Sequence, residues 1–339
     1  MDLGLRRRAV VLAVPVLAAA LLAAGCAKIP SLDPTGDPET TEVLPEGPVV
    51  SPLTGLTLAD GLPSHPVYVV KVDNTSASRP QVGVIHADLV VEELVEGGLT
   101  RLAALYYSKT PAAIGPVRSM RDTDVAIARP AEATLIASGG APATIERIQQ
   151  SGIDVISEDT GQLGVLVKAP DRRAPYDRIL DLGALAATAD DTSFVKGYLP
   201  FGPAGAQPGT TPATSFSVRF SAGSSTRWAL QGKRYRRQDG LAAPGKEFKA
   251  DNVLVLRAPV TSAGYADVAG NDVPETVLAG SGEATLFHRG RLVEGRWRKS
   301  SVSSRLRLET SDGSALEVPA GRTWIELVPE GTGSVAVTG

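Results

Sequence analysis

The sequence predicts an α+β protein in which a mixed α/β domain precedes a smaller all-β domain. Three observations lead to this prediction. Apolar runs alternate with glycine turns and helical patterns between residues 67 and 152. Short apolar stretches separated by turns occupy residues 216–328. A segment rich in Gly, Pro and Thr, residues 198–214, divides the two regions. Mixed patterns are typical of α/β layers, whereas short strands at regular spacing are typical of a sandwich or barrel.

Residues 1–25 are expected to be a lipoprotein signal peptide. Arginines at positions 6–8 precede an uncharged apolar run, residues 9–24, which is short for a bilayer span. Cys26 follows the stretch Leu-Ala-Ala-Gly, so we expect it to carry a lipid. That anchor makes the membrane a partner and places the protein on the outer face of the cytoplasmic membrane. An ordinary secretory signal with an incidental cysteine is the alternative.

Composition argues against several classes of function. The chain has 339 residues and a net charge of −3, whereas nucleic-acid binding requires dense positive charge, so no nucleic-acid partner is expected. Cys26 is the only cysteine, and the three histidines lie far apart in the sequence. We therefore expect no metal site and no cofactor. The common motifs of zinc proteases, P-loop proteins, serine hydrolases and dinucleotide-binding enzymes do not occur in the sequence.

Residues 26–48 are rich in Pro, Thr, Glu and Gly and are expected to be a disordered tether. The first domain follows at residues 49–197. A strand over residues 67–72 ends at Asp73 and Asn74. Two apolar runs, residues 89–96 and 99–107, flank Gly97-Gly98, which favours a tight hairpin.

Two helices are predicted further along this domain. Ser119, with Asp122 three residues later, resembles a weak capping box and indicates a helix that ends at Pro130. A strand over residues 134–137 enters a Ser-Gly-Gly turn, and a helix over residues 142–150 follows and stops at Gly152. The order strand, glycine turn, helix is an α/β pattern.

The second domain is predicted at residues 215–331, after the linker at 198–214 and before a small-residue tail at 332–339. Turns such as Asp239-Gly240 and Asp312-Gly313 separate its apolar stretches. The strand candidates are residues 216–221, 228–230, 235–238, 253–256, 283–287, 292–297, 306–309 and 323–328.

The hairpin carries the candidate carboxylates. If Gly97 and Gly98 are its two turn residues, residue 94 lies opposite Arg101 and residue 92 opposite residue 103, so Glu92, Glu96 and Arg101 share one face. If residues 88–96 form a helix instead, Glu92 and Glu96 still share a face. Such a group can perform acid/base catalysis, bind a cation or hydrogen-bond sugar hydroxyls. A purely structural set of ion pairs with Arg101 is the alternative.

The candidate anion site lies at the predicted helix starts. Arg118 and Arg121 flank the first start, and Gly139-Gly140 precedes the second, where free N–H groups favour anions. Ion pairs with Glu92, Glu96 or Asp122 are the structural alternative, and Ser119 is more readily explained as a cap than as a nucleophile. We expect Asp73, Glu96, Arg101, Arg118 and Arg121 to converge on one groove. The full set of predicted ligand-binding residues is Asp73, Asn74, Arg79, Glu96, Gly97, Gly98, Arg101, Arg118, Ser119, Arg121, Gly139 and Gly140.

These motifs resemble a known family. The matching segments are Pro-Leu-Thr-Gly at 52–55, Val-Asp-Asn at 72–74 with Arg-Pro-Gln at 79–81, Val-Glu-Gly-Gly-Leu-Thr-Arg at 95–101, Gly-Pro-Val-Arg-Ser at 115–119, Ser-Gly-Gly at 138–140, Arg-Ala-Pro at 173–175, Tyr-Arg at 235–236 and Thr-Trp at 323–324. Over residues 50–330 the chain resembles the YerB-like bacterial lipoproteins, whose two domains have no known function. Tyr176-Asp177 stands where that family usually has His-Asn, and Leu-Ala-Ala at 241–243 lies where it often has a His and an Asp.

The sequence thus predicts a membrane-anchored extracytoplasmic lipoprotein that binds a polar or anionic cell-envelope ligand, such as peptidoglycan or a wall polymer. Two alternatives stay open. One is an envelope hydrolase or lyase using Glu92 and Glu96. The other is a protein–protein adaptor in wall synthesis, whose protein partner the sequence does not identify.

Overall fold

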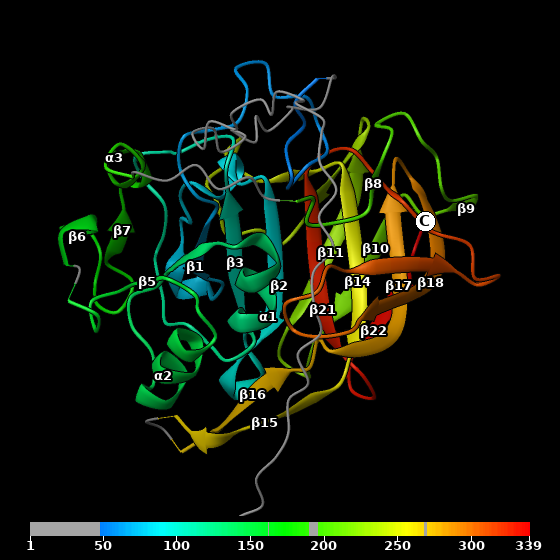
Figure 1. Ribbon diagram of the computed structural model, residues 1–339. Coiled ribbons are helices and arrows are strands. Elements are labelled where there is room, and N and C mark those ends of the chain that lie inside the picture. Colours follow the sequence, from blue (N-terminus) through cyan, green and yellow to red (C-terminus); the bar gives the residue numbers. More distant parts are fainter. Residues whose placement is uncertain (1–47, 162, 190–195, 268–269) are drawn as a thin grey trace, which may run out of the picture. The chain divides into compact units, whose positions relative to one another are not determined.

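One long, mixed sheet runs through both predicted domains of the computed structural model (Figure 1). The structure describes residues 48–339 except 162, 190–195 and 268–269, so the predicted signal peptide, Cys26 and most of the tether lie outside the described residues. The strands follow in the order β19 (Arg307–Thr310), β18 (Arg291–Lys299), β17 (Gly280–His288), β14 (Asn252–Ala258), β21 (Thr323–Pro329), β2 (Leu89–Leu94), β3 (Thr100–Tyr106), β1 (Tyr68–Asp73), β4 (Thr134–Ile136) and β5 (Val155–Ile156), with β9 (Thr211–Pro212) paired to β18.

The sheet is continuous because β21 pairs in parallel with strands of both halves. Its residue 324 lies opposite residue 253 of β14 on one side and residue 90 of β2 on the other. Residues 47–339 accordingly form one compact unit. The protein is mostly sheet with a few short helices, which agrees with the prediction in its coarse form, strands and helices in one chain.

A second sheet of five strands belongs to the C-terminal half. It has the order β13 (Lys249–Ala250), β12 (Arg234–Arg237), β11 (Ser225–Gln231), β10 (Ser215–Arg219) and β22 (Ser334–Val337). Three two-stranded sheets pair β15 (Val260–Ala266) with β16 (Asp272–Thr276), β20 (Val318–Pro319) with β8 (Phe201–Gly202), and β6 (Leu166–Lys168) with β7 (Arg178–Leu180). The α-helices are α1 (Asp124–Ala128), α2 (Pro142–Gln150) and α3 (Leu182–Ala186).

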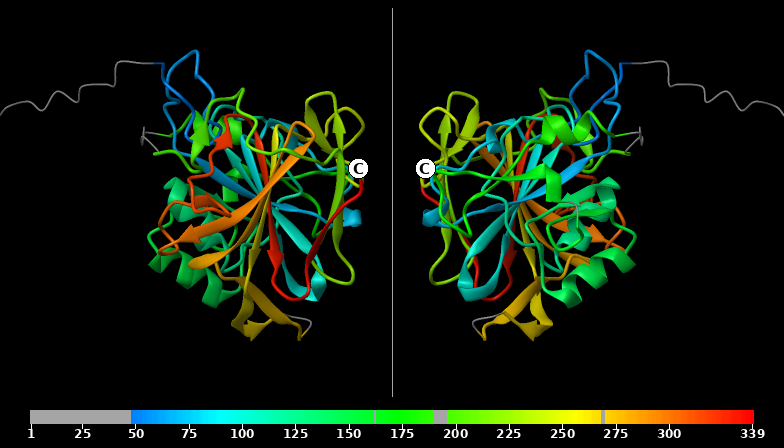
Figure 2. Two further views of the ribbon diagram at one scale, coloured as in Figure 1. Left: turned by 90° about the vertical axis from the view of Figure 1, so that its right-hand side faces the viewer. Right: turned by 90° about the vertical axis from the view of Figure 1, so that its left-hand side faces the viewer.

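Each face of the long sheet buries its own core. One face packs under α1 and α2, with Val69, Val91 and Leu105 in its core. The other packs against the five-stranded sheet, with Val70, Trp228 and Trp324 in its core. Figure 2 shows the helices and the five-stranded sheet on opposite sides of the long sheet. Because both faces are covered, the central strands β1, β3 and β21 are buried along their whole length rather than at alternate residues.

Several predicted elements are confirmed. The first strand ends at Asp73, as expected. Helix α2 has the predicted bounds, with Pro142 at its first turn and Gly152 at a φ of 74° just beyond its end. Each of the eight strand candidates in the C-terminal half overlaps a strand of the structure.

The predicted linker and tail also contain ordered structure. Strands β8 and β9 lie in residues 198–214, where Tyr198 and Leu199 are buried. Strand β22 lies in the predicted tail and pairs with β10, placing Val337 opposite Phe216. The sequence predicts a tail here because the residues are small, but a four-residue edge strand needs only backbone pairing along its inner side.

Two local predictions are wrong. Residues 89–94 form the expected strand and not the alternative helix, but the hairpin register differs by one residue from the expected one. Residue 93, not 94, lies opposite Arg101, because residues 96–98 form a short 3-10 turn with both glycines at positive φ. Helix α1 begins at Asp124 with Thr123 before it, so Ser119 is not its cap.

Candidate functional site

Five of the predicted residues lie close to the point where β1 ends and β3 begins. The β1–β3 ladder places Asp73 directly opposite Arg101. The segment that carries Arg118 and Arg121 follows these strand ends, because Val117 bridges to Val72 and the Arg118 N–H donates to the carbonyl of Lys71. Glu96 belongs to the turn between β2 and β3. We call Asp73, Glu96, Arg101, Arg118 and Arg121 the arginine cluster.

Two ion pairs order this cluster. Arg118 Nη1 lies 2.8 Å from Asp73 Oδ2, and Arg121 Nη2 lies 2.6 Å from Glu96 Oε1. The other Asp73 oxygen accepts hydrogen bonds from the N–H and the hydroxyl of Thr75. The Arg118 guanidinium also lies over the ring of Tyr176, 5.2 Å from its centroid. Tyr176 thus holds the guanidinium by a cation–π contact.

Arg101 is the unpaired member of the cluster. It is 7% exposed, and its Nη1 donates to the carbonyl of Ser119 at 3.0 Å. Within the described residues, no carboxylate forms an ion pair with it, and its Nε has no hydrogen-bond partner. Burial and then the positive charges of Arg121 and Arg118 lower the pKa of Arg101 to about 10. A guanidinium in this position is stabilised by any anion that reaches it.

Glu92 does not belong to this group, which corrects the predicted sharing of a face. It lies on the opposite face of the sheet and is 1% exposed. Its Oε1 accepts hydrogen bonds from Asn74 and Thr100, both at 2.8 Å, and its Oε2 lies 3.2 Å from Arg237 Nη1 on β12. The one-residue change of register causes this, since it turns each side chain of β2 to the other face.

Glu92 has a second acidic neighbour that sequence reasoning missed. Glu326 of β21 lies directly opposite Glu92 in the parallel ladder and is 0% exposed. Its Oε1 accepts hydrogen bonds from Thr226 Oγ1 at 2.9 Å and Trp228 Nε1 at 2.8 Å, while its Oε2 has no partner. Burial first, and then the charge of Glu92, raises the pKa of Glu326 well above its usual range, and Arg237 opposes this.

A buried charge network on the helix-covered face was also missed. Lys71 contacts Glu93 and lies 2.6 Å from Asp124, and the three side chains are fully buried. Asp124 in turn accepts a hydrogen bond from the Arg121 N–H at 2.7 Å, which joins this network to the arginine cluster. A signal did exist, since Lys71 interrupts the run Tyr-Val-Val-Lys-Val-Asp of a strand covered on both faces.

The remaining predicted residues are dispersed or already satisfied. Arg79 is exposed, and Gly98 accepts a hydrogen bond from Ser221. At the glycine turn before α2, the Gly140 N–H donates to Asp159 at 3.0 Å, so a carboxylate of the chain already occupies this helix start. The carbonyl of Gly139 accepts a hydrogen bond from the N–H of Met120, which lies between Arg118 and Arg121. Gly97 has open space around its Cα.

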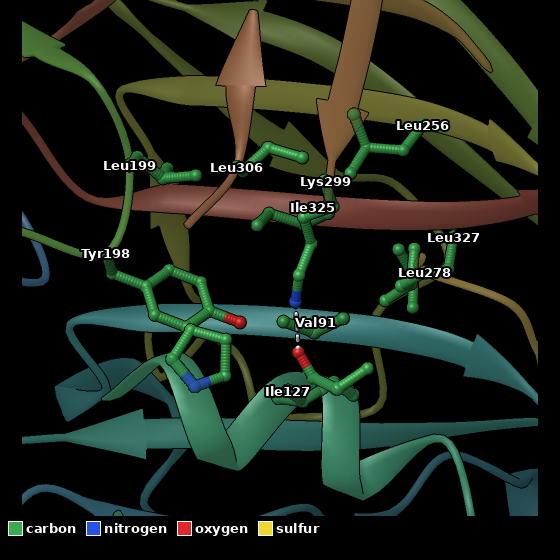
Figure 3. Close-up of a pocket in the computed structure, with 12 residues that line it drawn as sticks. Val91, Ile127, Tyr198, Leu199, Leu256, Leu278, Lys299, Leu306, Ile325 and Leu327 are labelled. Carbon is green, nitrogen blue, oxygen red and sulfur yellow. Dashed lines mark hydrogen bonds between the residues drawn. The ribbon is translucent and has the colours of Figure 1, made fainter. Parts of the chain in front are cut away.

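A small cavity of about 30 Å³ lies elsewhere, between α1 and the long sheet. Figure 3 shows its walls, which are apolar side chains such as Val91, Ile127 and Leu256 around Lys299. It is large enough for water but not for a polar ligand of several groups. In the described part of the chain, no helix is long and apolar enough to cross a membrane.

Comparisons with known proteins agree with this architecture. Residues 53–195 match the N-terminal domain, and residues 216–325 the C-terminal domain, of the family described as "Protein of unknown function (DUF3048)". The chain is 25% identical over 303 residues to "Putative lipoprotein YerB" of Bacillus subtilis (strain 168), covering 83% of this chain and 86% of that one. The crystal structure of the YerB protein from Bacillus subtilis is similar in fold, with a TM-score of 0.71 at 22% identity, covering 85% of this chain and 99% of that one. With both halves matched and the fold shared, the chain belongs to the YerB-like, DUF3048 family.

Proposed function

We propose that this protein is a lipid-anchored extracytoplasmic binding protein whose arginine cluster holds a polar, partly anionic ligand of the cell envelope. Peptidoglycan and wall polymers are the ligands of this chemistry outside a bacterial membrane. The lipid anchor is supported by the leader and Cys26, and by the relative that bears the name of a lipoprotein.

The observation that carries the proposal is the state of Arg101. Three guanidinium groups meet only two carboxylates in the cluster, and the most buried guanidinium has no carboxylate of its own. Glu93 lies opposite Arg101 in the ladder, but its bonded oxygen contacts Lys71. The side chains of Arg118 and Arg121 are 20% and 12% exposed, so an incoming anion can reach the arginine cluster.

The hydrolase alternative is weakened by the same geometry. Glu92 and Glu96 have separate partners, Arg237 and Arg121, and Glu92 is buried beneath the five-stranded sheet. A glycosidase requires two carboxylates that flank one substrate bond. The adaptor alternative has no particular surface in its favour, so binding is the function that the geometry supports best.

Ligand binding is tested by titrating the mature chain, residues 26–339 with Cys26→Ser, with soluble muropeptides in a calorimeter. We expect the double variant Arg118→Gln, Arg121→Gln to bind at least about tenfold more weakly, since each removes a charge-assisted bond to the anion. Arg147→Gln is the control, because Arg147 is an arginine of the same half whose partners are Asp122 and Glu275. Unchanged affinity in the double variant together with a lower melting temperature would show that the cluster is structural.

Anchoring is tested separately in cells. We expect Cys26→Ser to leave the membrane fraction or to accumulate as an unprocessed precursor, because it removes the residue that would carry the acyl chains on which stable attachment depends. The two forms are distinguished by size on a gel. A processed Cys26→Ser protein that still sediments with membranes would refute the lipid anchor.

A further inference from the structure

Positive charge gathers where β18 ends and β19 begins. Arg298 lies directly opposite Arg307 in the ladder, and both side chains are exposed. Arg305, in the connecting loop, is exposed as well. Like charges directly opposite one another destabilise a strand pair, so the fold has no structural use for this arrangement. The chain as a whole is weakly acidic, which makes the local excess of arginine the more informative.

These side chains line a hollow of about 910 Å³. Its walls come from three stretches of the chain, residues 197–200, 280–281 and 298–307. Its charged lining residues are Arg298, Lys299, Arg305 and Arg307, with no Asp or Glu among the lining residues. Hydroxyl groups are supplied by serines at positions 281, 300 and 304. The hollow therefore offers forked cationic donors and hydroxyl donors together.

The arginines are available for a ligand. Within the described part of the chain, Arg305 and Arg307 have no ion pair, and Arg298 pairs with Glu309 at 2.7 Å. The side chains of that pair are 53% and 30% exposed, so the contact is solvent-screened and weak. A competing anion can therefore replace Glu309 at little cost.

Lys299 makes the wall of the hollow rigid. Its side chain turns inward, into the apolar cavity beneath α1 (Figure 3). Its Nζ donates to the carbonyls of Ala126 and Val302, both at 2.8 Å. These bonds tie the loop after β18 to helix α1. A site whose walls are already ordered loses less conformational entropy when it binds.

We propose that this hollow binds the phosphodiester groups of a flexible polyanionic chain. Arginine forks match phosphate oxygens in pairs, and the serine hydroxyls supply further donors. Arg305 and Arg307 are two residues apart, about 7 Å in extended backbone, which fits successive groups of a chain rather than one ion. The charges line a concave surface, which fits a strand of polymer better than a flat membrane. The proposal uses no residue of the arginine cluster and does not rest on the function proposed above.

The test measures binding of a short synthetic glycerol-phosphate oligomer to the mature chain with Cys26→Ser, which retains the whole compact unit of residues 47–339. We expect the triple variant Arg298→Gln, Arg305→Gln, Arg307→Gln to bind at least about tenfold more weakly and with a shallower dependence on salt. The matching Arg→Lys triple keeps the charge but loses the forked donors, so it should bind more tightly than the Gln triple and more weakly than the wild type. The Gln triple should melt at or slightly above the wild-type temperature, because the replaced side chains are exposed and the opposed charges of Arg298 and Arg307 are removed.

The matched control replaces Arg219, Arg227 and Lys168 with Gln. These side chains are exposed, lie outside the hollow and remove the same charge. An equal loss of affinity in this control would overturn the proposal, because general electrostatics would then explain binding. Failure of the oligomer to bind would overturn it too, as would binding of phosphatidylglycerol vesicles without binding of the oligomer. A separate muropeptide titration reports on the arginine cluster, so the two proposals can fail independently.

Discussion

Glu326 and Glu92 show how individual side chains join the two halves of the protein. They lie side by side on neighbouring strands and both are buried, and of the two only Glu92 forms an ion pair with Arg237, which also pairs with Asp239. Burial raises the pKa of both carboxyl groups, most strongly that of Glu326. One cation cannot balance two buried negative charges, so Glu326, whose pKa is raised more, keeps its proton to a higher pH than Glu92 does.

This arrangement makes folding stability depend on pH. A carboxyl group with a raised folded pKa stabilises the native state fully below its unfolded pKa, about 4.4, and that contribution is lost as the pH rises toward the folded value. Glu326→Gln keeps the acceptor for Thr226 and Trp228 but does not titrate. We expect the wild type to lose up to about 1.4 kcal/mol per pH unit within this window and the variant to lose less. Urea unfolding between about pH 5 and pH 8 measures the difference.

Glu330→Gln is the control for this prediction, because Glu330 is an exposed carboxylate just beyond the same strand. It should leave the pH profile of the free energy of unfolding unchanged. If the free energy of unfolding of the wild type and of Glu326→Gln changed in parallel with pH, the raised pKa of Glu326 would be contradicted.

At the scale of elements, the sequence predicted the features that depend on neighbouring residues. Pro142 and Gly152 bracket α2, and short apolar runs between turns identify the strands of the C-terminal half. The β2–β3 register was not predictable from Gly97-Gly98 alone, since a Gly-Gly pair is compatible with several turns and a one-residue difference exchanges the faces. That single difference moved Glu92 away from the arginine cluster.

The C-terminal strand β22 is a second element that pattern reading missed, and its contribution can be measured. It pairs four residues with β10, and Gly339 accepts a hydrogen bond from the Ser215 N–H. We expect deletion of residues 332–339 to lower the free energy of unfolding by about 1–4 kcal/mol, at the scale of a few cross-strand pairs. Urea denaturation measures the loss.

Thr332→Ala, in the exposed turn before this strand, is the control for the deletion and should change stability little. A truncated protein within about 0.5 kcal/mol of the wild type would mean that β22 does not support β10.

At the scale of the whole molecule, the order of the strands in the sheet could not be predicted from the sequence pattern. Periodicity identifies a strand and its buried faces but not its neighbours in a sheet. The apolar run of β21 is evident in the sequence, yet nothing local indicates that β2, far away in the chain, lies beside it. The two family-model segments therefore look separable in the sequence while they share one sheet in the structure.

This continuity changes what we expect of the C-terminal half alone. The sequence predicts that residues 215–331 fold independently, whereas a fragment of residues 214–339 leaves the β21 edge that meets β2 unpaired and uncovers Glu326. We expect the fragment to show no cooperative melt by circular dichroism, and to regain one when mixed with residues 48–213. A cooperative, strand-rich melt of the fragment alone would favour the independent domain.

The place of β21 also has a consequence for the order in which the chain can fold. Strand β2 pairs with β3 nearby in the chain, but its second partner, β21, is synthesised about 230 residues later. Until then β2 presents an open, apolar edge, and the native pairing must close a very long loop. Such distant contacts slow folding and expose nascent chains to aggregation. Substitutions that weaken β21 should therefore reduce the yield of folded protein in cells more than they reduce its stability in vitro.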